Sequence, residues 1–288
     1  MSRIAYVNGS YVSHGAAGVH VEDRGYQFAD GVYEVFTIDR GRLVDAQAHY
    51  DRLWRSLHEL SMAPPMGRRA LDVVLHEVIR RNRLRRGIVY LQVTRGVAQR
   101  DHAFPASAVP GIVITARRGG RPSPANREYG VRVVTVPDIR WARCDIKSIS
   151  LLPNVLAKQV AREAGAYEAW QVDADGMVTE GASSNAWMVD TDGNLVTRPL
   201  THAILGGITR KVLKQLADEQ GIRVIERAFS VEEAKAAREA FVTSATSFVT
   251  PVVQIDDTVI GNGRPGSTAA RLIALYDAHI DGAALTKT

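Results

Sequence analysis

The chain has 288 residues, of which 45% are hydrophobic and 23% charged, an ordinary globular composition with material for a sizeable core. The formal net charge is +5, from 36 basic and 31 acidic residues, which suits an anionic ligand only weakly. The single cysteine, Cys144, excludes a disulfide within the chain and a zinc site built from cysteines, and no metal site is predicted. No apolar run is typical of a signal peptide or a membrane span, so we expect a cytoplasmic protein without a membrane partner.

The first part of the chain predicts a mixed α+β unit. The segment VYEVFTIDRGRLVD alternates apolar and polar residues around a turn at residues 39–42, which is typical of a hairpin. The next segment, AHYDRLWRSLHELSM, predicts a helix whose apolar stripe contains Leu53, Trp54, Leu57 and Leu60. A second helix is predicted in RRALDVVLHEVIRRN, and strands are predicted in GIVYLQVTRG and PGIVITARR.

The densest basic run, IRRNRLRRG at residues 79–87, has two interpretations. It could bind the phosphates of a nucleic acid. It could also be the solvated end of a helix, where the helix dipole favours cations. Neither interleaved aromatic residues nor a nucleic-acid-binding motif accompanies the run, so the second interpretation is favoured and no nucleic-acid partner is predicted.

A change of composition separates the two halves of the chain. The segment RRGGRPSPANR concentrates Gly, Pro and Ser, which is typical of a linker. We therefore predict a small N-terminal domain at residues 1–118, a linker at 119–125 and a larger C-terminal domain at 126–288. Two α+β domains with a cleft between them are the expected architecture.

The second half alternates strand and helix patterns. A strand is predicted in YGVRVVTVP, followed by a helix in PNVLAKQVAREAG with Pro153 in its first turn. The segments EAWQVDADGMVTEG and SNAWMVDTDGNLVTRP predict strands joined by Asp-Gly turns. A helix in GITRKVLKQLADEQG is predicted to end at Gly221, FVTSATSFVTPVVQID is predicted to be extended, and the last helix is predicted from about Ser267.

Lys147 lies in RCDIKSISLLPNVLAK, where the chain turns from polar to apolar residues. Burying an ammonium group is costly, so a buried lysine needs compensation. Either a charge partner or conversion into a Schiff base would provide it. The segment alone leaves both possibilities open.

Three further segments could bind a ligand. Glu180, in VTEGASSN, precedes a turn of small residues; it could keep a heteroaromatic nitrogen protonated, as pyridoxal-phosphate chemistry requires, or be a surface carboxylate. In LGGITRKVL, the backbone N–H groups of Ile208 and Thr209 could bind an anion at a helix N-terminus or form a plain cap. The hydroxyl-rich TSATS at residues 243–247 could be a second lobe of a phosphate site.

The segment VTRGVAQRDHAFP places Arg100 and His102 two residues apart, hence on one face of an extended chain. An arginine fork suits bidentate binding of a carboxylate, and a histidine can add a donor. A polar loop with an exposed arginine is the alternative. Both interpretations fit the segment taken alone.

Together these segments resemble the fold-type IV, or class IV, pyridoxal-phosphate aminotransferases, and most closely the members that act on D-amino acids. They keep their order and spacing from about residue 22 to about residue 255. The matching stretches are DRGYQFADGVYEV, HYDRLW, VTRGVAQRDHAFP, IRWARCDIKSISLLPNVLAKQ, TEGASSN, GGITR and FVTSATSFVTPV. The resemblance implies a two-domain α+β fold, with a small N-terminal α/β domain, a larger C-terminal mixed β/α domain and the cofactor between them.

The resemblance also implies roles around pyridoxal 5′-phosphate. Lys147 would form the Schiff base and then move the proton between the substrate Cα and the cofactor, and Glu180 would pair with the pyridine nitrogen. Phosphate contacts would come from Arg52, Ile208, Thr209, Ala245 and Thr246. Contacts to the phenolic oxygen and the ring would come from Arg140 and Leu205.

For the substrate, the resemblance implies binding by Tyr33, Val35, Arg100 and His102. Arg100 and His102 would come from the neighbouring subunit of a homodimer. The implied reaction is ping-pong transamination between a D-amino acid, such as D-alanine or D-glutamate, and a 2-oxo acid. Three enzymes of the same fold remain alternatives: a branched-chain L-aminotransferase, an (R)-amine transaminase and an aminodeoxychorismate lyase. The Arg100–His102 pair favours the D-amino-acid enzyme.

Two positions depart from the family pattern. Ala245 stands where the family has a hydroxyl residue, so one side-chain contact to the phosphate is expected to be missing. Phe248 stands where the family has an acidic residue, and the sequence gives no account of that change.

Overall fold

The computed structural model describes residues 3–119 and 122–282, which form two compact units. Unit 1 comprises Met1–Gly120 with Ile146–Leu151, and unit 2 comprises Arg121–Asp145 with Leu152–Thr288. The short segment that carries Lys147 packs with unit 1, although the predicted division places it in the C-terminal domain, and the boundary between the units falls within the predicted linker at 119–125. Both units mix helices and sheets, so the predicted α+β class is confirmed.

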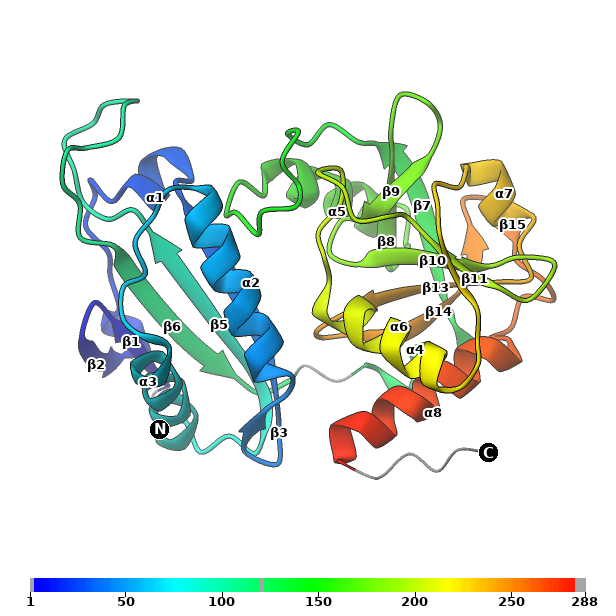
Figure 1. Cartoon of the computed structure of the whole chain (residues 1–288), viewed down its shortest axis with the longest axis horizontal. Helices are drawn as coiled ribbons and strands as arrows, with labels where there is room; N and C mark the ends of the chain where they lie inside the picture. Colours follow the sequence, from blue (N-terminus) through cyan, green and yellow to red (C-terminus); the bar gives the residue numbers. More distant parts are fainter. Residues whose placement is uncertain (1–2, 120–121, 283–288) are drawn as a thin grey trace. The chain divides into compact units, whose positions relative to one another are not determined.

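Unit 1 is built on a six-stranded sheet in the order β2-β1-β6-β5-β3-β4, and α2 lies across it in Figure 1. The strands are β1 (Ile4–Val7), β2 (Ser10–Ser13), β3 (Gly31–Asp39), β4 (Arg42–Leu43), β5 (Arg86–Thr94) and β6 (Gly111–Arg117). The helices are α1 (Arg24–Phe28), α2 (Ala46–Glu59) and α3 (Arg68–Arg81), with a 3-10 turn at His14–Ala16.

The hairpin and the first long helix form as the sequence predicts. Asp39 pairs with Arg42 across a two-residue turn in which Arg40 and Gly41 have φ angles of 51° and 80°, as a type I′ turn requires. On α2 the apolar stripe faces the sheet core, with Leu53 and Leu57 only 1% exposed. Burying each of these leucines stabilises the unit by about 1.5–3 kcal/mol.

The basic run at residues 79–87 covers the end of α3 and the start of β5. Arg80 and Arg81 lie in the last turn of α3, and both form ion pairs with Glu77 on the same helix. This is the arrangement expected of a solvated helix end, because the cations lie near the negative end of the dipole.

Unit 2 is built on a nine-stranded mixed sheet in the order β12-β11-β10-β13-β14-β7-β8-β9, with β15 paired to β14. The strands are β7 (Val131–Pro137), β8 (Glu168–Val172), β9 (Val178–Gly181), β10 (Asn185–Val189), β11 (Leu195–Thr197), β12 (Val224–Glu226), β13 (Glu239–Ser244), β14 (Phe248–Ile255) and β15 (Thr258–Val259). The helices are α4 (Pro124–Tyr129), α5 (Leu152–Glu163), α6 (Ile208–Glu219), α7 (Val231–Lys235) and α8 (Ser267–Asp281). In Figure 1, α6 and α8 lie close together; both contact β13, whereas α5 contacts β7 and β8.

Local turn chemistry accounts for much of unit 2. Each of the two predicted Asp-Gly turns closes with a glycine at positive φ: Gly176 at 77° and Gly193 at 87°. Pro153 is the second residue of α5, and Gly221, with φ 67°, follows the end of α6. These features confirm the predicted strands and helices.

A helix that the sequence analysis did not expect begins inside the predicted linker and extends beyond it. Residues 120–121 of this linker lie outside the described part of the chain. Helix α4 begins at Pro124, the position at which a proline costs no hydrogen bond, and it ends before Gly130, whose φ is 76°. One of the prolines that indicated a linker, Pro124, is thus the start signal of a short helix that Gly130 ends.

Within residues 3–119 and 122–282, no helix has the length and apolar character needed to cross a bilayer.

Helix α1 ends at a strained residue. Ala29 caps the helix in the left-handed region, with φ 55° and ψ 29°, where a Cβ is unfavourable. We expect Ala29→Gly to raise the free energy of unfolding by roughly 0.5–1 kcal/mol, because removing Cβ relieves more strain than the added chain entropy costs. Urea unfolding measures the change.

The control is Ala70→Gly on the exposed surface of α3, which should lower the free energy of unfolding because ordinary helical backbone gains nothing from glycine. If both variants lowered the free energy of unfolding, Ala29 would carry no backbone strain.

Candidate active site

Lys147 lies in unit 1, on a short segment that runs beside β3. The backbone carbonyl of Lys147 accepts a hydrogen bond from the Tyr33 N–H at 3.0 Å, and Ser148 forms a β-bridge with Val32. The Lys147 N–H donates to the Ser56 hydroxyl of α2 at 3.3 Å. Its Nζ lies 4.1 Å from the centre of the Tyr33 ring. The backbone bonds therefore fix the position from which the Lys147 side chain projects, and that side chain is only half-buried.

Strand β3 presents different residues on its two faces. Tyr33 and Val35, the predicted substrate contacts, are half-buried and share one face by the alternation of the strand. Tyr33 stacks on Tyr90 of the neighbouring β5, with ring centroids 5.7 Å apart. The structure thus brings Tyr33 and Lys147 together in unit 1.

The other face of β3 carries a buried charge that the sequence analysis missed. Glu34 is completely buried and accepts hydrogen bonds from Arg52 Nε and Nη2, each at 2.7 Å, and it pairs with His49 Nδ1 at 2.7 Å. Burial would raise the pKa of Glu34, but the charge and hydrogen bonds of Arg52, with His49, hold it at about 2. Arg52, the predicted phosphate ligand, is therefore oriented by a bidentate pair. The sequence did contain a sign of this buried charge, because Glu34 occupies a position in VYEVF that the alternation predicts to be buried.

We expect Glu34→Gln to lower the free energy of unfolding by about 3–5 kcal/mol at pH 7, because Arg52 is left without a buried counter-charge. The depressed pKa gives a pH dependence with a defined sign. The contribution of Glu34 is fully present above pH 4.5 and is lost as the pH falls towards about 2. The difference between wild type and variant should therefore shrink across this window in urea titrations.

Glu77→Gln is the matched control, since Glu77 forms ion pairs with Arg80 and Arg81 at the solvated surface. It should change stability little because solvent screens the pairs. A Glu34→Gln variant that behaves like the control would contradict the orienting role of Glu34.

Arg100 and His102 lie on the segment that follows β5, also in unit 1. The Arg100 guanidinium lies 4.9 Å from the Phe28 ring centre, and the His102 ring lies 5.5 Å from the same ring. Among the described residues, no hydrogen bond, ion pair or ring contact joins Arg100 or His102 to Tyr33 or Lys147. Within one chain, Arg100 and His102 therefore form a set of contacts separate from that of Tyr33 and Lys147.

Unit 2 holds the second cluster, centred on Glu180 at the end of β9. The carboxylate of Glu180 is 5% exposed and accepts hydrogen bonds from Arg140 Nη1, from Asn185 Nδ2 at 2.9 Å and from the Leu205 N–H at 3.1 Å. Three donors, one of them charged, stabilise the negative charge of this carboxylate. The structure thus unites Arg140, Glu180 and Leu205, three predicted cofactor contacts.

Arg140 is itself fixed by neighbours. Its Nε and Nη2 donate to the two oxygens of Asp138 at 2.9 and 2.7 Å, and Nη2 also donates to the Ala203 carbonyl at 3.1 Å. Burial would raise the pKa of Asp138, but hydrogen bonds and charge from Arg140, with Thr179, hold it below its usual range. Arg140 therefore links the end of β7 to Glu180.

Asn185 connects the parts of this cluster and was not singled out by the sequence analysis. Besides Glu180, its Nδ2 donates to the Leu205 carbonyl at 2.9 Å, and β10 pairs Asn185 with Thr243 on β13. A Cβ on Gly207 would lie 2.1 Å from Asn185 Oδ1, so any larger residue at position 207 would force Asn185 to shift. The closing asparagine of TEGASSN was the signal.

The N-terminus of α6 fits a phosphate group. The first N–H groups of a helix, here those of Ile208 and Thr209, have no acceptor within the helix, and Gly207 supplies no side-chain cap. A Cβ on Gly206 would make only ordinary contact, with Leu200 at 3.7 Å. With twelve residues, Ile208–Glu219, α6 carries a full dipole whose positive end favours an anion.

The hairpin between β13 and β14 carries Ala245 and Thr246, both half-buried. Hydroxyls gather around them: Ser244 Oγ lies 2.6 Å from Ser247 Oγ and 3.5 Å from Thr246 Oγ1. Phe248 instead belongs to the core, since it is 2% exposed and its ring centre lies 5.3 Å from that of Tyr276. The departure at Phe248 therefore replaces a polar residue by a packed ring.

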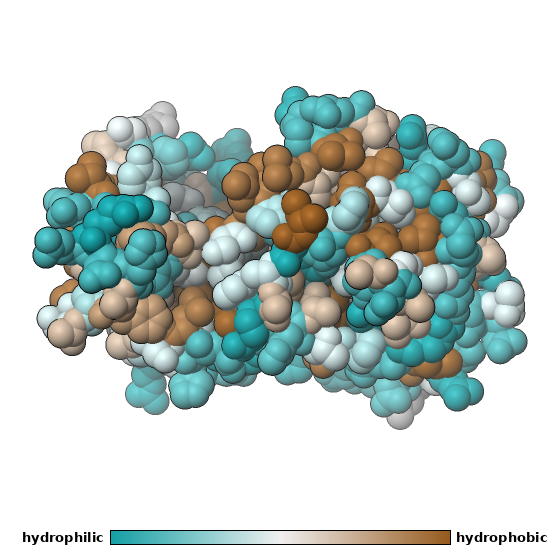
Figure 2. Space-filling model, turned by 90° about the horizontal axis from the view of Figure 1, so that it is seen from above, coloured by the Kyte–Doolittle hydropathy of each residue, from teal (hydrophilic) through white to brown (hydrophobic). Residues whose placement is uncertain are grey.

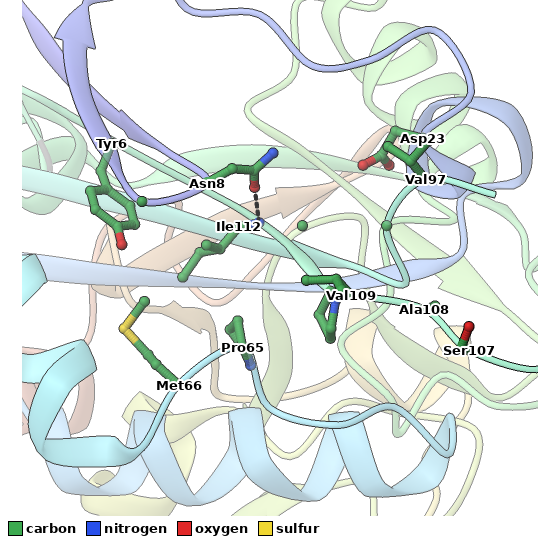
Figure 3. Close-up of a pocket in the computed structure, with 14 residues that line it drawn as sticks. Tyr6, Asn8, Asp23, Pro65, Met66, Val97, Ser107, Ala108, Val109 and Ile112 are labelled. Atoms are coloured by element: carbon green, nitrogen blue, oxygen red, sulfur yellow. Dashed lines mark hydrogen bonds between the residues drawn. The ribbon is translucent and has the colours of Figure 1, made fainter.

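A separate pocket of about 690 Å³ opens in unit 1, and none of the predicted site residues lines it. Figure 3 shows Tyr6, Met66, Val109 and Ile112 around it, with the Asn8 side-chain oxygen accepting a hydrogen bond from the Ile112 N–H at 2.7 Å. Most of the lining side chains are apolar, and Asp23 and Ser107 add polar groups. Within the described ranges, no group of three or more His, Cys, Asp or Glu could hold a metal ion.

Comparisons with known proteins match most of the chain. The family model described as amino-transferase class IV matches residues 31–255. The D-alanine aminotransferase of Staphylococcus haemolyticus is 40% identical over 277 residues, which is 96% of this chain and 97% of the relative.

Solved structures are similar over nearly the whole chain. The branched-chain amino acid aminotransferase of Escherichia coli superposes with a TM-score of 0.90 at 25% identity, covering 99% of this chain and 97% of that one. A hypothetical aminotransferase from Mycobacterium tuberculosis in its PLP-bound form shares the fold, with a TM-score of 0.83 at 22% identity, covering 97% and 99%.

Proposed function

We propose, since the chain belongs to the amino-transferase class IV family, that it transfers the amino group of a D-amino acid, such as D-alanine or D-glutamate, to a 2-oxo acid. The observation that carries this proposal is the 40% identity to a D-alanine aminotransferase over 96% of the chain. The loop with Arg100 and His102 supports it, because a guanidinium fork and an imidazole are suited to a substrate carboxylate.

Pyridoxal 5′-phosphate is the cofactor, and the residues present fit it. When bound, it supplies an electron sink that stabilises negative charge at the substrate Cα. The N–H groups of Ile208 and Thr209, with Arg52, are suited to hold its phosphate, and Glu180 its pyridine nitrogen. Lys147 would carry it through Nζ.

Lys147 Nζ would then act as the base that moves the proton from the substrate Cα to the cofactor in the first half of the ping-pong cycle, and in the opposite direction in the second half. The backbone contacts with Tyr33 and Ser56 hold the lysine in place for this task. Tyr33, beneath the amine, offers a hydroxyl to the substrate carboxylate. Arg100 and His102 would fix that carboxylate so that the Cα–H of a D-amino acid faces the lysine.

We expect Glu180→Gln to slow the half-reaction by about tenfold or more, roughly 1.4 kcal/mol of barrier, because an amide stabilises a protonated pyridine nitrogen less than a carboxylate does. Stopped-flow absorbance measures the rate constant. The control is Glu239→Gln, whose carboxylate accepts the backbone N–H groups of Thr268 and Ala269 at the start of α8. An unchanged rate in Glu180→Gln would exclude the proposed pairing.

We also propose a homodimer in which Arg100 and His102 serve the neighbouring subunit. Large apolar side chains are exposed on the same part of unit 1 as these two residues: Val21 is 71% exposed, Tyr26 76% and Val109 85%. Figure 2 shows apolar surface gathered in patches on the face it draws, and such patches are typical of contacts with another chain. Sedimentation velocity tests this proposal, and an active monomer would contradict it.

A free Cys144 fits the reducing cytoplasm, where we propose that the enzyme acts.

A branched-chain L-aminotransferase is the second candidate, because the Escherichia coli enzyme with that activity superposes at a TM-score of 0.90. A panel of half-reactions separates the two candidates. We expect rapid spectral change with D-alanine or D-glutamate and slow change with L-leucine or (R)-phenylethylamine. Preference for L-leucine would overturn the D-amino-acid assignment and leave the aminotransferase assignment standing.

A further inference from the structure

The segment that carries Arg100 and His102 has little secondary structure of its own. Between β5 and β6 it forms only one isolated bridge, from Val97 to Asp23. Its two ends approach closely, since a Cβ on Gly96 would lie 2.0 Å from the Val109 carbonyl oxygen. A loop of this kind holds one conformation only if side chains from the rest of the fold fix it, because ordering its backbone costs entropy.

Arg24, the first residue of α1, supplies such a contact. Its side chain is 3% exposed; Nη1 donates to the Asp101 carbonyl at 2.6 Å, and Nη2 reaches the His102 carbonyl at 3.4 Å. One turn later, the Phe28 ring lies against both Arg100 and His102. Helix α1 therefore holds both the backbone and the side chains of the Arg100–His102 pair.

Arg24 is in turn held by Asp30, and together with Arg95 these residues form what we call the Asp30 cluster. Asp30 Oδ2 accepts Arg24 Nε at 2.8 Å and Arg95 Nε at 2.7 Å. Arg95 anchors the cluster to the body of unit 1 by donating to the carbonyls of Leu60 and Ser61 at 2.8 and 3.2 Å. The three side chains are no more than 10% exposed.

A buried cluster of two guanidinium groups and one carboxylate is a poor source of stability, since desolvation offsets most of the attraction. It does, however, fix the orientation of the groups it binds, because each guanidinium can bind a carboxylate and two carbonyls in fixed geometry. In this protein the chain of hydrogen bonds runs from the body of unit 1 through Arg95, Asp30 and Arg24 to the carbonyls of the loop.

We propose that Arg24, oriented by the Asp30 cluster, is a positioning residue for substrate recognition: it sets the placement of Arg100 and His102 and thereby the affinity for the substrate carboxylate. This inference rests on the proposed function, in which those two residues bind that carboxylate. Arg24 acts through the loop and takes no part in proton transfer at Cα.

The test is Arg24→Lys in the holoenzyme, because lysine can still pair with Asp30 but lacks the fork that reaches the two carbonyls. In the half-reaction with D-alanine, the apparent dissociation constant should rise between about tenfold and 100-fold while the limiting rate constant stays nearly unchanged. Phe28→Leu should act in the same direction by removing the ring beneath Arg100 and His102. Amide exchange of residues 98–104, followed by mass spectrometry, should accelerate in both variants.

Asn82→Ala is the matched control, since Asn82 bonds Ile4 and Val78 in the same unit and makes no such contact with the loop. It should lower stability and leave both the dissociation constant and the exchange of residues 98–104 at wild-type values. Wild-type affinity for D-alanine in Arg24→Lys, or equal losses in the control, would overturn the inference. Failure of the wild type to react with any D-amino acid would instead overturn the proposed function.

Discussion

Replacing Lys147 by alanine is expected to abolish multiple turnover of D-alanine with a 2-oxo acid while both units stay folded. A general base contributes about 10²–10⁴ to a rate, and Lys147 would also hold the cofactor, so the loss should reach at least that size. The fold should persist because the bonds of this segment to Tyr33 and Ser56 use backbone atoms of residue 147. Steady-state assays measure turnover, and circular dichroism verifies the fold.

Lys158→Ala is the control, since Lys158 ends the same RCDIKSISLLPNVLAK segment but binds the Tyr167 carbonyl at 2.7 Å and Glu168 at 3.1 Å. It should retain turnover. In wild type, borohydride should fix the cofactor to the peptide that contains Lys147. Labelling of another lysine, or near-normal turnover in Lys147→Ala, would remove Lys147 from the mechanism.

The second large effect is expected for Arg100→Ala. Binding a carboxylate without its guanidinium partner costs about 2–5 kcal/mol, so the half-reaction with D-alanine should lose that much in transition-state stabilisation. The half-reaction with (R)-phenylethylamine should lose far less, because this amine has no carboxylate. The ratio of the two rate constants, compared between wild type and variant, isolates recognition of the carboxylate from the chemistry at Cα.

Equal losses for both substrates would mean that Arg100 supports the structure only. The D-amino-acid assignment would then lose its main chemical support, and the broader assignment to the class IV aminotransferases would remain.

Elements whose cause is local could be predicted from the sequence. The β3–β4 turn follows from a glycine in its second central position, and α2 from leucines spaced to bury one stripe. The same holds for α6, whose glycines mark both ends. Such signals act within a few residues, so neighbours in the sequence suffice to read them.

Features with a distant cause could not be predicted. Strand β12 has three residues, and it exists because Val224–Glu226 pairs with β11. Glu34 and Asn185 look like isolated polar residues until the fold supplies Arg52 to one and the Leu205 carbonyl to the other. The role of a buried polar group can be recognised only when its hydrogen-bond partner is known, and that partner lies elsewhere in the chain.

The resemblance to the family did indicate some of these distant partners, because motifs that keep the family's order and spacing are expected to share its fold. It named Lys147, Glu180 and Arg140 without geometry, and the structure brings Glu180 and Arg140 into direct contact. It did not indicate that Arg24 supports the Arg100–His102 segment. Supporting contacts of this kind involve backbone carbonyls, which leave no mark on the identity of the residues they hold.

The segment Ile146–Leu151 belongs to unit 1, although the 25 residues before it belong to unit 2. Synthesis proceeds from the N-terminus at about 5–20 residues per second, and a domain usually folds once its last residue has emerged. Unit 1 therefore cannot complete its folding until Ile146–Leu151 has been synthesised, which happens only after 25 residues of unit 2. Until then, the Tyr33 N–H lacks the carbonyl that it binds in the finished protein. The lysine that would carry the cofactor is thus among the last parts to join the unit that holds it.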